Sequence, residues 1–170
     1  KLLWLCEHAP DLLARADRFL LWGDAILFLL GGEPVASFSL ANRTLLFDLW
    51  KEDWSDELLD FAGLSRGKFG VCVPAGKVVG TVSNEAARLC GLRPGVRLVS
   101  GGHDQCCNAL GAGLVRPGQA VCGIGSFECL TPVYATIPEP ARLLRHGLNI
   151  EHHVLPGLYV SFLYNQGGTL

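Results

Sequence analysis

The sequence predicts a mixed α/β protein, because helix-like and strand-like segments occupy different parts of the chain. The first half carries short helix-like segments at 2–8, 11–16, 24–30, 55–63 and 83–91. A strand-loop-helix unit follows at 96–112, and strand-like segments then dominate, at 119–125, 128–135, 148–154 and 158–164. We therefore place a boundary between two parts of the chain near residues 113–118.

Two helices have clear ends in the sequence. Ser55 and Ser83 stand where a capping residue is preferred, an acidic residue follows in each first turn, and Gly63 and Gly91 come just after the last turns. Both segments are predicted to be short surface helices. The β-prone run 96–100 ends in two glycines before the next helix, and 137–147 is predicted as a looser connection.

The composition narrows the class of protein. The 170 residues are 49% hydrophobic, with a mean hydropathy of +0.31, which is enough to bury a core of about one domain. Only 18% are charged and the formal net charge is −2, so bulk charge favours neither a nucleic-acid partner nor an anionic membrane. The chain has no Met and opens at Lys1 inside a predicted helix, which indicates a piece of a longer protein.

The cysteines and the apolar segments point to a cytoplasmic protein. The seven cysteines have no framework spacing and form no C-x-x-C pair, which fits a reducing compartment. The longest apolar stretch, 19–30, is interrupted by Gly23 and Asp24 and is too short to cross a bilayer, so it is predicted to be a buried core element. The four tryptophans are also predicted to pack in the core or between helices.

The segment Gly101-Gly102-His103-Asp104-Gln105 is the first candidate site. Glycines after a strand allow a tight turn, and an acid and an amide at the start of the next helix then face the crevice where α/β sheets bind ligands. Asp104 is placed to accept a proton from a substrate hydroxyl. On the simpler interpretation, Asp104 only caps its helix and Gln105 faces solvent.

The second candidate site is the segment Gly123-Ile124-Gly125-Ser126 between two predicted strands. Its backbone N–H groups and hydroxyl suit a phosphate oxygen, although a plain hairpin turn has the same pattern. The pair Gly167-Gly168 is similar. A metal or redox protein is a further alternative, with less support because its cysteines and histidines lack ligand spacing; it would use Cys106, Cys107, Cys122, Cys129, His103, His146, His152 and His153.

Several segments, in order, resemble the FGGY family of carbohydrate kinases, the group of glycerol kinase, xylulokinase and gluconokinase. Residues 39–48, Ser-Leu-Ala-Asn-Arg-Thr-Leu-Leu-Phe-Asp, are similar to the family's Ala-Ser-x-Thr-x-Leu-Phe segment, and 54–59 to its next helix. Residues 78–92 resemble the stretch before the family's catalytic loop. Several motifs in the family's order are more specific than any one of them.

The resemblance implies a role for each candidate residue. The family's catalytic base matches Asp104, and its sugar-holding Gln matches Gln105, with His103 beside it on the substrate side. Its Gly-Thr phosphate turn matches Gly125-Ser126, with Ser in place of Thr. Its later Gly-rich helix start, in the nucleotide pocket, matches Gly167 and Gly168. The family's N-terminal Asp-x-Gly-Thr phosphate loop has no counterpart in this sequence.

The resemblance also implies an actin-like, ribonuclease-H-like fold of two α/β domains. Residues 1–115 would end the first, sugar-binding domain, and 118–170 would begin the second, nucleotide-binding domain, with a hinge near 113–118. The implied activity is phosphorylation of a sugar or polyol hydroxyl by ATP with Mg²⁺, without a nucleic-acid or membrane partner. A homo-oligomer is compatible with this assignment, and an inactive kinase-like binding module or an incomplete piece without turnover is the alternative.

Overall fold

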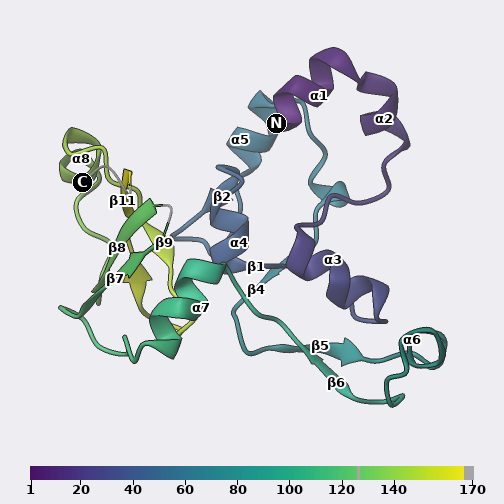
Figure 1. Ribbon diagram of the computed structural model, residues 1–170. Helices are drawn as coiled ribbons and strands as arrows, with labels where there is room; N and C mark the ends of the chain where they lie inside the picture. The colour runs from purple at the N-terminus through teal and green to yellow at the C-terminus, as the bar shows by residue number, and fades with distance from the viewer. Residues whose placement is uncertain (126, 167–170) are drawn as a thin grey trace. The chain divides into compact units, whose positions relative to one another are not determined.

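The computed structural model describes residues 1–125 and 127–166 (Figure 1). The chain forms two compact units, Lys1–Ser100 and Gly101–Leu170. Both contain helices and strands, in agreement with the α/β class predicted from the sequence. Within the described ranges, no helix is both long and apolar enough to cross a membrane.

The first unit combines short helices with three two-stranded sheets. β1 pairs with β4 in parallel, whereas β2 with β3 and β5 with β6 are antiparallel pairs. Its elements are α1 (Leu2–His8), α2 (Pro10–Arg15), α3 (Trp22–Leu29), β1 (Val35–Ser37), α4 (Phe38–Asn42), β2 (Phe47–Asp48), β3 (Asp53–Trp54), α5 (Asp56–Phe61), a 3₁₀ turn (Arg66–Lys68), β4 (Val71–Val73), β5 (Val78–Thr81), α6 (Asn84–Cys90) and β6 (Arg97–Val99).

The β1–β4 pair contributes side chains to two hydrophobic clusters. Val35 and Val73 pack into a cluster with residues of β5, β6 and α6, whereas the adjacent Ala36 and Cys72 pack toward Trp54, Phe69 and residues of α4 and α5. Successive side chains of a strand point to opposite faces, so a strand pair can contribute to both clusters at once. This explains why all three residues of β1 are buried, without alternation of buried and exposed positions.

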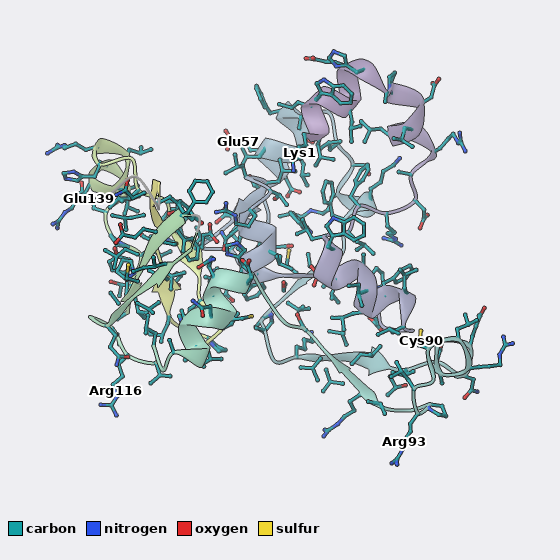
Figure 2. All side chains as sticks on the ribbon, in the orientation of Figure 1. Lys1, Glu57, Cys90, Arg93, Arg116 and Glu139 are labelled. Atoms are coloured by element: carbon teal, nitrogen blue, oxygen red, sulfur yellow. The ribbon has the colours of Figure 1, made fainter. Side chains whose placement is uncertain are left out.

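The ends of the two helices with predicted serine caps are confirmed. The Ser55 hydroxyl accepts a hydrogen bond from the Leu58 amide at the start of α5, and the Ser83 hydroxyl accepts one from the Ala86 amide at the start of α6. Gly91 ends α6 with φ of +68°, in the left-handed region that glycine adopts without strain. Figure 2 labels Cys90 at this end of α6 and Arg93 in the loop that follows.

The apolar segment 19–30 differs from its prediction as a buried core element. Its residues 22–29 form α3, in which Asp24 is buried, whereas Trp22 and Leu29 are 88% and 76% exposed. Leu27 and Leu30 do pack against the cluster around β5. Only one helix face can contact the core, so a helix that is apolar all round still exposes part of its surface in this unit. Of the four tryptophans, Trp54 alone is buried, with its Nε1–H donating to the Gly70 carbonyl at 2.8 Å.

The second unit contains α7 (Asp104–Gly111) and α8 (Pro140–Arg145) with an antiparallel sheet of five strands among its described residues. β8 is the central strand of this sheet, because β7, β10 and β11 all pair with it, and β10 also pairs with β9. The strands are β7 (Ala120–Ile124), β8 (Phe127–Tyr134), β9 (Glu151–His152), β10 (Tyr159–Val160) and β11 (Leu163–Gln166). In Figure 1 they run from green to yellow.

Asn149 accounts for two differences from the predicted strands. The strand expected at 148–154 is reduced to β9, and the strand expected at 158–164 is divided into β10 and β11. The Asn149 side-chain oxygen accepts the Phe162 amide at 2.9 Å, and its carbonyl accepts the Ser161 hydroxyl at 2.6 Å. These bonds occupy the Asn149 carbonyl and the Phe162 amide, two backbone groups that a continuous strand would offer to its neighbour. The connection at 137–147 contains α8, whose first residue is a proline.

Candidate active site

The loop and helix that carry the first candidate site are formed as expected. Gly101 and Gly102 precede α7, His103 is its capping residue, and Asp104 is its first helical residue. Asp104 therefore does not occupy the cap position of the simpler interpretation. Its carboxylate still accepts the Gln105 amide at 2.8 Å, and its side chain is 82% exposed. The carboxylate is thus at the N-terminus of α7 and open to solvent.

The His103 ring lies between two carboxylates. Its Nε2 is 3.1 Å from Oδ1 of Asp104, and its Nδ1 is 3.8 Å from Oε2 of Glu151. The ring also meets Phe162 edge-on, with the two centroids 5.2 Å apart, and the His103 side chain is only 16% exposed. The ring is thus held on its buried side while its other nitrogen reaches the exposed Asp104.

Glu151 is a residue of this site that the sequence analysis did not identify. Its side chain is 5% exposed, and its Oε1 accepts a hydrogen bond from the side-chain Nδ2 of Asn149 at 3.0 Å. Asn149 is itself anchored by the Phe162 backbone amide. The carboxylate is therefore oriented, with Oε2 toward His103. The available signal in the sequence was an acidic residue inside the predicted strand at 148–154.

Cys106 completes this cluster of side chains. It follows His103 by three residues, lies on the same face of α7, and is fully buried, with its Sγ–H donating to the His152 carbonyl at 3.6 Å. The ligand atoms of His103, Cys106 and Glu151 all lie within 4.8 Å of one another. Among the described residues, the other cysteines and histidines named as a metal alternative form no such group.

His152 and His153 are buried structural residues. The His152 ring packs against Tyr159, with the centroids 5.0 Å apart. Nδ1 of His153 accepts the Leu155 amide at 3.0 Å, so its proton resides on the other nitrogen. Burial, partly offset by a hydrogen bond to the Leu114 backbone, lowers the pKa of His153, so this ring is neutral at pH 7.

The turn of the second candidate site joins β7 to β8 in an antiparallel hairpin. The Gly125 amide donates to the Phe127 carbonyl at 3.0 Å, and the space where a Gly125 side chain would begin is open. The hairpin is thus present. Ser126, Gly167 and Gly168, the other residues predicted to bind the nucleotide, lie outside the described residues.

A separate hollow of about 580 Å³ on the second unit contains none of the predicted site residues. It lies between the β7–β8 hairpin and α8, and its lining includes Pro132, Tyr134 and Leu143. Gln105, in contrast, lies on the first turn of α7 with its side chain partly exposed. The candidate chemistry is therefore on the α7 side of this unit.

Comparison with known proteins adds a family model, described as the N-terminal domain of the FGGY family of carbohydrate kinases, that matches residues 1–111. The autoinducer-2 kinase of Escherichia coli strain K12 is 36% identical over 159 residues, and that of Salmonella choleraesuis strain SC-B67 is 35% identical over the same length. Each alignment covers 93% of this chain. The chain spans 29% of the length of these curated relatives.

Solved structures show the same likeness. The chain resembles a xylulose kinase from Rhodospirillum rubrum with a TM-score of 0.88 and 28% identity, over 99% of this chain and 34% of that protein. A Brucella ovis protein, described as a xyloylose kinase, has a TM-score of 0.86 and 27% identity, over 96% of this chain and 33% of that protein. The fold of a Plasmodium falciparum glycerol kinase is also similar, with a TM-score of 0.78 at 17% identity.

Proposed function

The chain belongs to the FGGY family of carbohydrate kinases, and we propose that the complete protein transfers a phosphoryl group from ATP to a hydroxyl of a sugar or polyol. The actin-like, ribonuclease-H-like fold of its structural relatives is the fold of this family. The observation that carries the proposal is the Asp104 carboxylate, exposed at the start of α7 immediately after Gly101-Gly102.

Asp104 is the proposed general base. As the substrate hydroxyl oxygen attacks the γ-phosphorus, its proton passes to the carboxylate, and ADP leaves. Two features support this role. The side chain is 82% exposed and can reach a bound sugar, and the Gln105 backbone amide, 2.8 Å from Oδ1, orients the carboxylate.

His103 and Gln105 are the proposed substrate-side residues. The Nε2 atom of His103, 3.1 Å from Asp104, restrains the direction of the carboxylate, and its partly buried ring is held by Phe162. Gln105 is at the next position of the same turn, and its amide group can donate and accept hydrogen bonds with sugar hydroxyls. Positioning of the hydroxyl is the larger part of catalysis in phosphoryl transfer.

The β7–β8 turn is the proposed contact for the ATP phosphates. The space beside Gly125 is open, as a contact with a phosphate group requires, and the Ser126 hydroxyl is the donor that the resemblance assigns there. Gly167 and Gly168 are proposed to line the nucleotide pocket. When bound, Mg²⁺-ATP supplies the phosphoryl group with its charge partly neutralised. We assign no Mg²⁺ ligand among the residues of this chain.

We also propose that residues 1–115 belong to the sugar-binding domain and residues 118–170 to the start of the nucleotide-binding domain. The match of the N-terminal domain model to residues 1–111 supports the first assignment. The glycines of 111–118 would then lie at the connection between the two domains, where a hinge is useful for closing on substrates.

The decisive experiment replaces Asp104 by Asn in the full-length protein. Asn keeps the size and the hydrogen bond to the Gln105 amide but cannot accept the hydroxyl proton. We expect kcat to fall about 10²–10⁴-fold, with sugar affinity and melting temperature close to those of the unchanged protein. Asp11→Asn, an exposed acid in the first turn of α2, is the matched control and should retain full activity.

A D104N variant that keeps most of its kcat would remove Asp104 from this role. If the unchanged full-length protein phosphorylates none of a panel of pentuloses, hexuloses, polyols and aldonates, the proposed activity is wrong, and a kinase-like binding module becomes the better description. Sugar binding measured by calorimetry separates that outcome from a failure to fold.

A further inference from the structure

We propose that His103, Cys106 and Glu151 form a binding site for one Zn²⁺-class cation, within the second unit and adjacent to Asp104. Thiolate, imidazole and carboxylate are the three side-chain ligand types that zinc takes in proteins. Their ligand atoms lie within 4.8 Å of one another, with Nδ1 of His103 3.8 Å from Oε2 of Glu151. The separation is near what the metal needs, because a tetrahedral ion with bonds of about 2.0–2.3 Å holds its ligands roughly 3.5 Å apart.

The surrounding hydrogen bonds are those that a metal site requires. A metal-ligating histidine usually has its other ring nitrogen on a carboxylate, and Nε2 of His103 is 3.1 Å from Oδ1 of Asp104. A ligating carboxylate is usually held by a further hydrogen bond, and Asn149 donates to Oε1 of Glu151 at 3.0 Å. With these two hydrogen-bonding atoms engaged, Nδ1 of His103 and Oε2 of Glu151 are left facing each other, 3.8 Å apart.

Charge and burial also favour a divalent ion. On binding, the Cys106 thiol loses its proton to solvent, so one thiolate and one carboxylate balance the two charges of the metal. Cys106 is fully buried and the Glu151 side chain is 5% exposed, so an ion held there is shielded from competing water. The fourth position would take a water molecule or the His152 carbonyl, which lies 3.6 Å from the sulfur.

The ligand set separates this site from any Mg²⁺ that accompanies ATP. Mg²⁺ prefers oxygen ligands and keeps several waters, whereas a sulfur and an imidazole nitrogen select zinc or cobalt. His103 would serve both sites, with Nδ1 on the metal and Nε2 on the proposed base. The cation site does not depend on the proposed kinase activity.

The test uses Co²⁺, which occupies zinc sites and has visible absorption, with the full-length protein after treatment with a chelator. We expect one equivalent of Co²⁺ to produce a thiolate-to-cobalt charge-transfer band and the d–d bands of a tetrahedral ion. Zn²⁺ should abolish both, because it binds such sites more tightly. Excess Mg²⁺ should leave them unchanged.

Two neighbouring cysteines provide the matched pair of variants. Cys106→Ser should lose the charge-transfer band, whereas Cys107→Ser, at the exposed next position of α7, should keep it. His103→Gln removes a ligand that is less buried than Cys106, and it should also lose the band. This variant tests the cation site if C106S does not fold. The absence of a band in the unchanged protein, or its retention in C106S or H103Q, would overturn the proposal.

Discussion

Asp24 is a carboxyl group in α3 that the structure places in the interior. It is 1% exposed, and Oδ2 accepts the Ser37 amide at 3.3 Å. Burial raises its pKa to about 6, and the bonds from Ser37 offset only part of that effect. In the unfolded chain, the pKa of the same group returns to about 3.8.

The folded state therefore holds the Asp24 proton more tightly than the unfolded state. Between pH 4 and 6, the unfolded chain has lost this proton while the folded chain retains it, so the stability that Asp24 contributes falls as the pH rises. We expect Asp24→Asn to match the original protein near pH 4 and to be more stable by about 1–3 kcal/mol at pH 7. Urea unfolding at a series of pH values measures the difference.

Asp17→Asn is the control for this experiment, since the Asp17 side chain is 93% exposed. Its difference in unfolding free energy should stay flat across the same pH range. A flat profile for D24N as well would mean that Asp24 is ionised in the folded protein down to its ordinary pKa.

Helix α6 provides the prediction at the scale of an element. The Ser83 hydroxyl accepts the Ala86 amide at 3.1 Å, which satisfies one of the amides that a helix start leaves unpaired. Ser83→Ala should lower the free energy of unfolding by about 1 kcal/mol. Ser65→Ala is the matched control, because Ser65 stands before the 3₁₀ turn and makes no such side-chain bond.

Thermal and denaturant unfolding of the two variants should separate them clearly. The S65A variant is expected to stay within a few tenths of a kcal/mol of the original protein. Equal losses in both variants would contradict the capping role of Ser83 and point to a general effect of removing a surface hydroxyl.

Elements with strong local signals were predicted well, and each difference has an identifiable cause. The serine caps and glycine ends placed α5 and α6, and the glycines before residue 103 placed the start of α7. The strands around residues 148–164 were predicted to be too long, because hydrogen bonds between Asn149 and residues 161 and 162 interrupt them. α8 was missed although Pro140 at its first turn was a visible signal.

At the scale of the whole molecule, residues 1–170 by themselves should show no measurable phosphorylation of a sugar by ATP. The chain spans 29% of the length of its curated relatives, and it contains no Asp-x-Gly-Thr loop of the kind that the family uses for phosphate. Phosphoryl transfer needs all its binding groups in position together. A coupled ADP-release assay, with the full-length protein measured in parallel, checks this.

Circular dichroism of the 170-residue protein supplies the control, since a folded but inactive chain is the expected result. Robust turnover by this chain would show that its own residues hold both substrates, and the proposed placement of the ATP site would have to be revised.

The sequence alone determined the α/β class, the helix ends and the motif around Asp104, because each of these depends on residues within a few positions of one another. The tertiary structure decided which side chains meet. His103 and Cys106 share a face of one helix, but Glu151 reaches them from a strand more than forty residues later. The position of Glu151 depends on the pairing of β9 with β10 and on the hydrogen bond between Asn149 and Phe162. Strand pairing between distant segments cannot be predicted from the residues next to each strand.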